Sequence, residues 1–429
     1  MISNKDKKYI WHPFTQEKTA PDNITIVKAK DAWLYAEDGT KYLDCISSWW
    51  VNMHGHSNNY INQKLAEQAA DMEHVIFAGF THPKAVEISE RIVGKLGPDF
   101  HKVFFSDNGS TSNEVALKMA FQYFYNQGKK RAKIIAFKDS YHGDTYGAMS
   151  VAARNEFSKP FEDNLFDVYH LDVPTKDNFA TVKKQLKKYL SLNDCAAFIF
   201  EPLVLGTAGM VMYSPEHLQE LMEMCSSVGV LNIADEVFTG FYRTGKLFSH
   251  QHLSKAPDLV CLSKGLTGGY LPLGLTVVNQ KIYDAFYSDN KLKAFFHGHS
   301  YTGNPLSCAV ACASLDLLEK QESEDNIKRI VQKHKDFAKV LATKKEVSNV
   351  RQQGTILAFD VNTSGKDSYF NSNRDKFYNF FLNKGILMRP LGNTLYLVPP
   401  YCTSNSELDL AYNAIKSLLN QIKKGSLTV

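Results

Sequence analysis

The sequence predicts an α/β fold, with a large domain built on a mostly parallel, helix-covered sheet and a smaller α+β domain. Three observations support this fold. From about residue 59, helical stretches alternate with short apolar runs, which is typical of parallel strands buried on both faces. The 429 residues exceed what one small core requires. Both ends of the chain carry strand patterns outside this alternation, so we expect the two ends to pack together as the smaller domain.

The N-terminal part of the chain predicts a hairpin. Residues 24–48 contain two strand-like runs joined at Asp38 and Gly39, a pair that favours a tight turn. Helical stretches follow at residues 59–75 and 83–97. The alternating region then supplies six predicted strands, at residues 102–106, 133–137, 196–201, 228–235, 258–263 and 273–278.

The helix expected near residue 215 has the clearest boundaries. Ser214 suits the N-cap, Pro215 the first helical position and Gly229 the residue just past the end. A long helical stretch is expected at about 304–343, followed by strands and a last helix. These patterns place the domain boundaries at 1–54 for the N-terminal part of the small domain, 55–315 for the large domain and 316–429 for the C-terminal part.

Composition excludes several classes of protein. Hydrophobic residues make up 44% of the chain, and the formal charge of +4 is too small to predict a nucleic-acid surface. No window approaches the roughly 18 apolar residues of a membrane helix, so we expect no membrane partner and a cytoplasmic location. The 7 cysteines are widely spaced without a CxxC pair, which predicts reduced cysteines and no zinc site.

Three predicted strand ends carry candidate functional residues. Gly109 and Ser110 open a helix after a strand, where free backbone N–H groups suit a phosphate; a capped helix after a tight turn is the plain alternative. Asp235 ends an apolar strand and could either cap a loop or hold a cationic ring nitrogen. Lys264 follows another strand and is either a surface lysine or, in a closed pocket, a nucleophile toward carbonyls.

Together these three features meet the requirements for binding pyridoxal phosphate, which needs a phosphate site, an acid for its ring nitrogen and a Schiff-base lysine. Ligands of parallel α/β sheets gather outside the carboxyl ends of the strands, where all three are expected. Tyr141, in a loop after the strand at 133–137, could stack on the pyridine ring or be a structural aromatic residue.

The motifs DNGSTSNEVALKMA, SYHGDTYGAMS, EPLVLGTAGM, ADEVFTGFYRTGKLF and SKGLTGG occur in this order. The chain thereby resembles the class III aminotransferases, which are fold-type I enzymes dependent on pyridoxal phosphate. Four further motifs restrict the resemblance to members that transfer an amino group from S-adenosylmethionine to 8-amino-7-oxononanoate in biotin synthesis. These motifs are WHPFTQ, SSWW, HGHSYTGNPLSCA and LMRPLGNTLYLVPPY.

The resemblance implies a role for each matching residue. Lys264 would carry the cofactor, Asp235 would pair with the pyridine nitrogen, and Gly109 with Ser110 would hold the phosphate. Ser300 matches a phosphate-binding threonine that the family donates from the neighbouring subunit, with Gly298 and His299 beside it. The resemblance therefore implies a homodimer with shared active sites, in which the remaining predicted cofactor-binding and substrate-binding residues are Tyr141, Phe14, Trp49, Trp50 and Arg389.

The adjacent Trp49 and Trp50 raise a question of their own, because neighbouring residues on a helix or strand do not share one surface. Simple core packing is one interpretation. The other is an aromatic wall for the apolar chain of the acceptor, with Arg389 binding the carboxylate at its far end. Arg243 could hold a carboxylate or bridge loops, and the sequence assigns it no role.

Several alternatives remain open at this stage. Phe14 stands where the family often has tyrosine, which leaves lysine, ornithine or another diamine as donors in a different class III ω-aminotransferase. A cofactor-sensing regulator on the same fold would need an added DNA-binding module, which the N-terminus is too short to provide. No G-x-G-x-x-G opens a βα unit near the start, which disfavours an oxidoreductase. His54 with His56, and His297 with His299, lack a third metal ligand.

Overall fold

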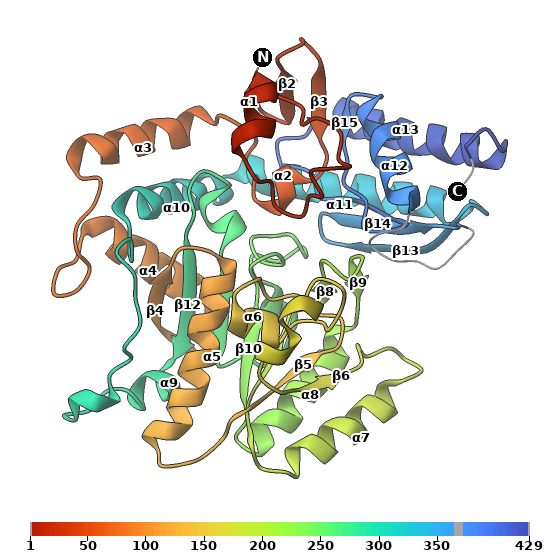
Figure 1. Ribbon diagram of the computed structural model, residues 1–429. Coiled ribbons are helices and arrows are strands. Elements are labelled where there is room, and N and C mark those ends of the chain that lie inside the picture. Colours follow the sequence, from red (N-terminus) through yellow and green to blue (C-terminus); the bar gives the residue numbers. More distant parts are fainter. Residues whose placement is uncertain (1, 364–371, 428–429) are drawn as a thin grey trace.

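The large sheet dominates the fold, which is seen here in a computed structural model that describes residues 2–363 and 372–427 (Figure 1). Its spatial order is β4 (Phe100–Ser106), β12 (Gly274–Asn279), β11 (Leu259–Leu262), β10 (Leu231–Asp235), β7 (Cys195–Phe200), β5 (Lys133–Phe137) and β6 (Val168–Leu171). Every pairing is parallel except those of β12, which runs antiparallel to both β4 and β11. The predicted mostly parallel sheet is confirmed, and β6 extends it by a strand that the sequence did not indicate.

Side chains of each strand alternate between two apolar layers, as the period of a strand requires. Ile134 and Ala136 of β5 belong to the cluster that includes α5 (Gly109–Asn126), whereas Ile135 and Phe137 belong to the cluster that includes α8 (Pro215–Ser227). Helices therefore cover both faces. The other helices of this region are α3 (Asn59–Asp71), α4 (Pro83–Leu96), α6 (Tyr146–Ser150), α7 (Phe179–Leu190), α9 (Gln280–Asp284) and α10 (Pro305–Leu318).

Local sequence signals define the ends of the predicted helix near residue 215. The Ser214 hydroxyl accepts the backbone N–H of His217, Pro215 occupies the first position of α8, and Gly229 has a φ of 72° just beyond its end. All three predicted positions are confirmed. The short strands β8 (Val204–Leu205) and β9 (Val211–Met212) lie in the loops. So do the 3₁₀ turns η1 (Lys159–Asn164), η2 (Ser249–His252), η3 (Lys264–Thr267) and η4 (Lys291–Lys293).

The two ends of the chain share a second sheet. It consists of β1 (Ile26–Lys30), β2 (Trp33–Ala36), β3 (Lys41–Asp44) and β15 (Ile386–Leu387). β2 and β3 form the hairpin predicted at Asp38 and Gly39, and Ile386 of the C-terminal part pairs with Leu43 in parallel. The predicted packing of both ends against each other is therefore confirmed. Among residues 2–363 and 372–427, no helix is long and apolar enough to cross a membrane.

The remaining C-terminal elements form a three-stranded antiparallel sheet with helices. Its strands are β13 (Val347–Gln353), β14 (Ile356–Val361) and β16 (Thr394–Leu397), accompanied by α11 (Gln321–Leu341), α12 (Ser372–Leu382) and α13 (Asn405–Lys423). The single helical stretch expected at 304–343 is wrong in one respect, because Lys320 is extended and separates α10 from α11. The two helices differ in environment: most of α10 is buried, whereas α11 buries one face only.

Candidate active site

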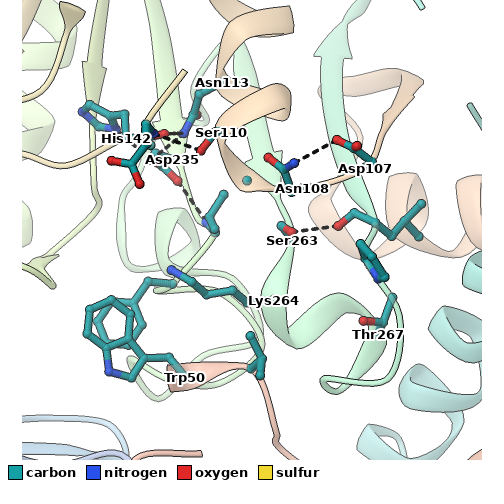
Figure 2. Close-up of a pocket in the computed structure, with 18 of the residues that line it drawn as sticks. Trp50, Asp107, Asn108, Ser110, Asn113, His142, Asp235, Ser263, Lys264 and Thr267 are labelled. Atoms are coloured by element: carbon teal, nitrogen blue, oxygen red, sulfur yellow. Dashed lines mark hydrogen bonds and ion pairs between the residues drawn. The ribbon is translucent and has the colours of Figure 1, made fainter. Parts of the chain in front are cut away.

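A cavity of about 620 Å³ opens at the carboxyl ends of the strands of the large sheet (Figure 2). Residues that follow or end four strands contribute to its lining: Asp107 after β4, Glu201 after β7, Asp235 at the end of β10, and Lys264 after β11. Parallel strand direction explains why they meet at one edge. The structure brings together six of the sequence-predicted site residues in this lining: Trp50, Gly109, Ser110, Tyr141, Asp235 and Lys264.

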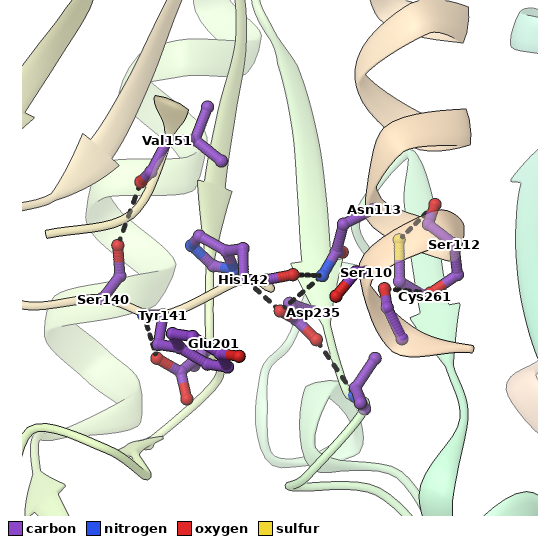
Figure 3. A network of polar contacts seen from close by, with 12 residues as sticks. Ser110, Ser112, Asn113, Ser140, Tyr141, His142, Val151, Glu201, Asp235 and Cys261 are labelled. Carbon is purple, nitrogen blue, oxygen red and sulfur yellow. Dashed lines mark hydrogen bonds and ion pairs between the residues drawn. The ribbon is translucent and has the colours of Figure 1, made fainter. Parts of the chain in front are cut away.

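Asp235 is a buried carboxylate held by two side chains and one backbone N–H group. Its Oδ2 atom accepts from Asn113 Nδ2 at 2.8 Å and lies 2.7 Å from His142 Nδ1, and its Oδ1 atom accepts the Val237 N–H at 3.1 Å (Figure 3). Since a carboxylate only accepts, His142 must carry its proton on Nδ1. These three contacts fix the carboxylate in the wall of the cavity, a position that suits a cationic ring nitrogen.

The start of α5 offers free backbone N–H groups to the cavity. Asn108 caps this helix, because its side chain accepts the Thr111 N–H while the Thr111 hydroxyl accepts the Asn108 N–H. Gly109 and Ser110 occupy the first two helical positions, where N–H groups have no partner within the helix. The Ser110 hydroxyl also accepts the Asp144 N–H at 3.2 Å. This arrangement suits a phosphate group.

Lys264 lies at the start of η3 in a left-handed conformation, with a φ of 41°. Its Nζ atom lies 4.8 Å from the Trp50 ring centre and 5.7 Å from that of Phe238. Burial lowers the pKa of Lys264, and the nearby carboxylates of Asp235 and Glu201 oppose this shift only in part. A buried lysine with a lowered pKa is able to act as a nucleophile and as a base.

Glu201 is a further ionisable group in the cavity wall. Its carboxylate accepts the backbone N–H groups of Tyr141 and Gly206, each at 3.0 Å, and burial raises its pKa to about 7. Tyr141 in turn donates its hydroxyl to Asp144 at 2.9 Å. Burial, followed by the Asp144 carboxylate, raises the pKa of Tyr141, so this phenol stays protonated. Glu201 thus ties the Tyr141 loop to the loop after β7.

The two adjacent tryptophans lie in a left-handed turn, α2 (Ser47–Trp50). The φ angles of its four residues are 50°, 44°, 72° and 74°, and none of the four is glycine. Such a conformation costs about 1–2 kcal/mol per residue, and strain of this kind is typical of functional sites. As a result Trp50 is 3% exposed and packs on Phe238, with ring centres 4.3 Å apart, whereas Trp49 is 40% exposed.

Trp49 belongs to a separate cluster beside the cavity. The Phe14 ring meets it edge-on at 5.6 Å, and the Arg389 guanidinium lies 4.8 Å from its ring centre. Within the part of the chain that the structure describes, we find no ion pair to Arg389. Trp50 links this cluster to the cavity, because it follows Trp49 in the chain and its ring faces Lys264. The predicted residues Phe14, Trp49 and Arg389 are therefore brought together, although outside the cavity lining.

Three predicted residues lie apart from the cavity in this chain. Gly298 and Ser300 are exposed, and His299 is partly buried. The loop that contains them is held locally, since the Thr302 hydroxyl accepts the His299 N–H and donates to the His299 carbonyl. None of the three lines the cavity that contains Lys264.

The remaining candidates have structural partners. His54 contacts the Ser314 hydroxyl at 3.0 Å, and burial lowers its pKa to about 3. Arg243 is 1% exposed and donates to the carbonyls of Pro399 and Trp50, so it bridges buried loops and is not part of an exposed salt bridge. Among residues 2–363 and 372–427, no group of three or more His, Cys, Asp or Glu side chains is placed to hold a metal. The seven cysteines are free thiols, six of them buried.

Sequence reasoning assigned no role to Glu201, Asn113 or His142. The signal for Glu201 was present, because it ends an apolar strand just as Asp235 does. His142 directly follows Tyr141 in the same loop. Asn113 gave no signal, since an asparagine inside a helix has no distinctive pattern and its contact with Asp235 spans 122 residues.

The fold and the site together define a class of enzyme. The family model described as aminotransferase class-III matches residues 15–419, and the chain belongs to this family. It is an aminotransferase dependent on pyridoxal phosphate, as the sequence predicted.

Three relatives that share one name are similar to the chain over nearly its full length. The chain is 46% identical to the adenosylmethionine-8-amino-7-oxononanoate aminotransferase of Synechococcus elongatus, over 96% of this chain and 99% of the relative. It is 35% identical to the protein of that name from Staphylococcus aureus, over 98% of each chain. The crystal structure of the protein of that name from Methanocaldococcus jannaschii is 34% identical, with a TM-score of 0.91, and the match covers 97% of this chain and 98% of that chain.

The residues of the cavity fit pyridoxal phosphate on chemical grounds. Lys264 supplies an amine that no hydrogen bond or ion pair from the described residues engages. Asp235 supplies a carboxylate that the side chains of Asn113 and His142 and the Val237 N–H hold in the cavity wall. Gly109 and Ser110 supply N–H groups at a helix start. Each of the three chemical demands of the cofactor therefore has its own residue in one cavity.

Proposed function

We propose that this enzyme transfers an amino group from S-adenosylmethionine to the ketone of 8-amino-7-oxononanoate, giving 7,8-diaminononanoate in biotin synthesis. One observation carries the proposal beyond the family. The Arg389 guanidinium lies 4.8 Å from the ring centre of Trp49, and the Lys264 Nζ atom lies 4.8 Å from the ring centre of the adjacent Trp50. The two adjacent tryptophans would then lie between a carboxylate site at Arg389 and the reactive amine, an arrangement that suits an apolar chain with a carboxylate at its far end.

Each residue of the cavity has a proposed role in catalysis. Bound pyridoxal phosphate supplies a ring that withdraws electrons from the donor carbon. Lys264 would hold the cofactor, and its amine, which burial favours in the neutral form by lowering its pKa, would accept and return the proton at the donor carbon. Asp235 keeps a proton on the ring nitrogen, and His142 with Asn113 holds Asp235 in position. Gly109 and Ser110 bind the phosphate through their N–H groups.

The substrate residues divide between the cavity and the Trp49 cluster. Tyr141 and Trp50 line the cavity near Lys264, and Trp49 with Phe14 extends the apolar surface toward Arg389. The guanidinium would bind the acceptor carboxylate through two parallel hydrogen bonds. Lysine is the second candidate donor, since Phe14 lacks the hydroxyl that a polar donor would use.

The proposal includes a homodimer with shared active sites. Gly298, His299 and Ser300 lie away from Lys264 in their own chain, so they would serve the site of a second copy, with Ser300 binding the cofactor phosphate. Ser300→Ala should weaken retention of pyridoxal phosphate during dialysis without altering the cavity of its own chain. A fully active monomer in size-exclusion chromatography with an in-line activity assay would contradict the shared site.

The substrate assignment is tested by assaying the pure protein with 8-amino-7-oxononanoate and each donor in turn. Formation of 7,8-diaminononanoate with S-adenosylmethionine is the expected result, and ping-pong kinetics should accompany it. Product formation with lysine alone would select the second donor. Failure with both donors, in protein that retains the absorption of bound pyridoxal phosphate, would refute this acceptor.

A further inference from the structure

The left-handed turn Ser47–Trp50 is held by a fully buried carboxylate. Asp44, at the end of β3, accepts hydrogen bonds from the backbone N–H groups of Ile46 and Ser48, at 3.2 and 3.0 Å. Its other oxygen accepts the Ser48 hydroxyl at 2.7 Å. The carboxylate therefore bonds the segment before the turn and the second residue of the turn at the same time.

His56 fixes this carboxylate from the other side. Its Nε2 atom lies 3.0 Å from Asp44 Oδ2, and because a carboxylate cannot donate, the proton resides on Nε2. The opposite ring atom, Nδ1, then accepts from Asn52 Nδ2 at 2.9 Å. The backbone of His56 is also fixed, since it exchanges two hydrogen bonds with Asp31 at 3.0 and 2.7 Å. Asp44 thus has a rigid partner outside the turn.

We propose that Asp44 and His56 are positioning residues for the amino acceptor. They hold Ser47–Trp50 in the left-handed turn, which directs Trp50 toward Lys264 and Trp49 toward Arg389. This inference rests on the proposed function, since it assigns Trp49 and Arg389 to the acceptor. Asp44 and His56 need not touch the substrate, and neither one lines the cavity.

The geometry indicates which tryptophan depends on this pair. Trp50 has further anchors, because its ring packs on Phe238 and its Nε1 donates to Tyr396 Oη at 3.3 Å. Trp49 is 40% exposed, and its ring contacts are with Phe14 and Arg389, both near the surface. Each of the four non-glycine residues is less stable in the left-handed region by about 1–2 kcal/mol, so loss of the hydrogen bonds to Asp44 weakens the turn. Loosening the turn should therefore displace Trp49 first and weaken binding of the acceptor.

Ser48→Ala tests the inference with little disturbance, since it removes one hydroxyl and keeps the Ser48 N–H bond to Asp44. In the holoenzyme the acceptor KM should rise about tenfold, as expected for a lost hydrogen bond to a charged group. The rate of the donor half-reaction at saturating donor should stay unchanged. Near-ultraviolet circular dichroism should report the altered Trp49 environment, a change that a general loss of stability would not produce below the melting temperature.

Two further variants serve as controls. Ser57→Ala makes the same chemical change at an exposed neighbour that also has a positive φ, of 51°, and should leave both KM and the dichroism unchanged. Ser48→Gly also loses the hydroxyl but adopts the left-handed conformation without steric cost, so it should be more stable than Ser48→Ala and should raise the acceptor KM less.

The outcomes separate this inference from the proposed function. If the wild type forms no 7,8-diaminononanoate, the proposed function is wrong. If the wild type is active and Ser48→Ala has the wild-type acceptor KM and dichroism, the positioning role is refuted. An equal loss of both half-reactions would also refute it. Asp44→Asn provides a second measurement, because its Nδ2 cannot accept from Ser48 and His56, and it should raise the acceptor KM at least as much as Ser48→Ala.

Discussion

The Nζ atom of Lys264 lies 4.8 Å from the ring centre of Trp50. Trp50 is 3% exposed and covers one side of an amine whose pKa is lowered by burial. The aromatic wall excludes water from the amine, and exclusion of water favours its uncharged form. The same ring thus belongs to the proposed acceptor surface and to the environment that lowers the pKa of Lys264.

Lys264→Met is the most direct test of the catalytic assignment. Methionine has a similar length but offers neither a nucleophile nor a base. Turnover should fall by at least about 100-fold, the lower end of what a positioned proton-transfer group contributes. The melting temperature should stay the same or rise, because an apolar side chain replaces a buried amine of similar volume. Turnover within a few-fold of the wild type, at an unchanged melting temperature, would exclude Lys264 from catalysis.

Glu201 should make stability depend on pH in a defined window. Its pKa rises from 4.5 to about 7 through burial, so the folded protein binds a proton more tightly than the unfolded chain. Between these two values the folded state holds more protons, and the free energy of unfolding therefore falls as the pH rises. Below 4.5 the contribution is fully present, and above about 7 it is lost.

The experiment compares the wild type with Glu201→Gln by chemical denaturation from pH 4.5 to 8, after a competing amine, hydroxylamine, has released pyridoxal phosphate and dialysis has removed it. The difference in free energy of unfolding, wild type minus variant, should decline with a slope of up to about 1.4 kcal/mol per pH unit. Glutamine loses one of the two acceptors for the Tyr141 and Gly206 N–H groups, which shifts the difference by a constant only. A flat difference would mean that Glu201 ionises normally.

Much of this site follows from the sequence because its parts are local. Gly109 with Ser110, Asp235 and Lys264 each stand at the end of an apolar strand, and the edge rule for parallel sheets predicts that they meet. Strand β5 has the predicted bounds, and the cap and terminal glycine of α8 are those expected. Such features depend on hydrogen bonds between residues that are close in the sequence, so the sequence alone predicts them.

Other parts of the structure depend on contacts between distant residues. The direction of β12 cannot be read from a run of apolar residues, since both orientations bury the same side chains. The left-handed turn at Trp49 and Trp50 has no glycine to indicate it, and Asp44 and His56 stabilise it through side chains. The domain boundaries at 54/55 and 315/316 and the roles of the predicted site residues stay predictions.

Trp49→Ala and Trp50→Ala should affect different properties of the enzyme. Removal of the buried Trp50 ring should cost about 3–5 kcal/mol of stability, as for other large core truncations. Trp49 is 40% exposed, so its removal should cost much less stability and should instead raise the acceptor KM, by up to about tenfold for a lost aromatic contact. Thermal unfolding and steady-state kinetics on both variants would decide. A large loss of stability for Trp49→Ala with an unchanged KM would show that Trp49 serves core packing and does not bind the acceptor.

Arg389 should recognise the acceptor by its carboxylate, which can be tested by changing the protein and the substrate together. The methyl ester of 8-amino-7-oxononanoate keeps the chain and the ketone but lacks the negative charge. With the wild type, kcat/KM for the acid should exceed that for the ester by roughly 10- to 100-fold, the range for a charged hydrogen bond. With Arg389→Met this preference should disappear, and Arg389→Lys should retain part of it, because an ammonium keeps the charge but cannot form two parallel hydrogen bonds.

Arg243→Lys is an informative comparison, since Arg243 is buried against backbone carbonyls and its replacement should lower stability without removing the preference for the acid. If Arg389→Met discriminates between acid and ester as well as the wild type does, the carboxylate binds elsewhere, and the aromatic surface beside Trp49 does not lead to its site.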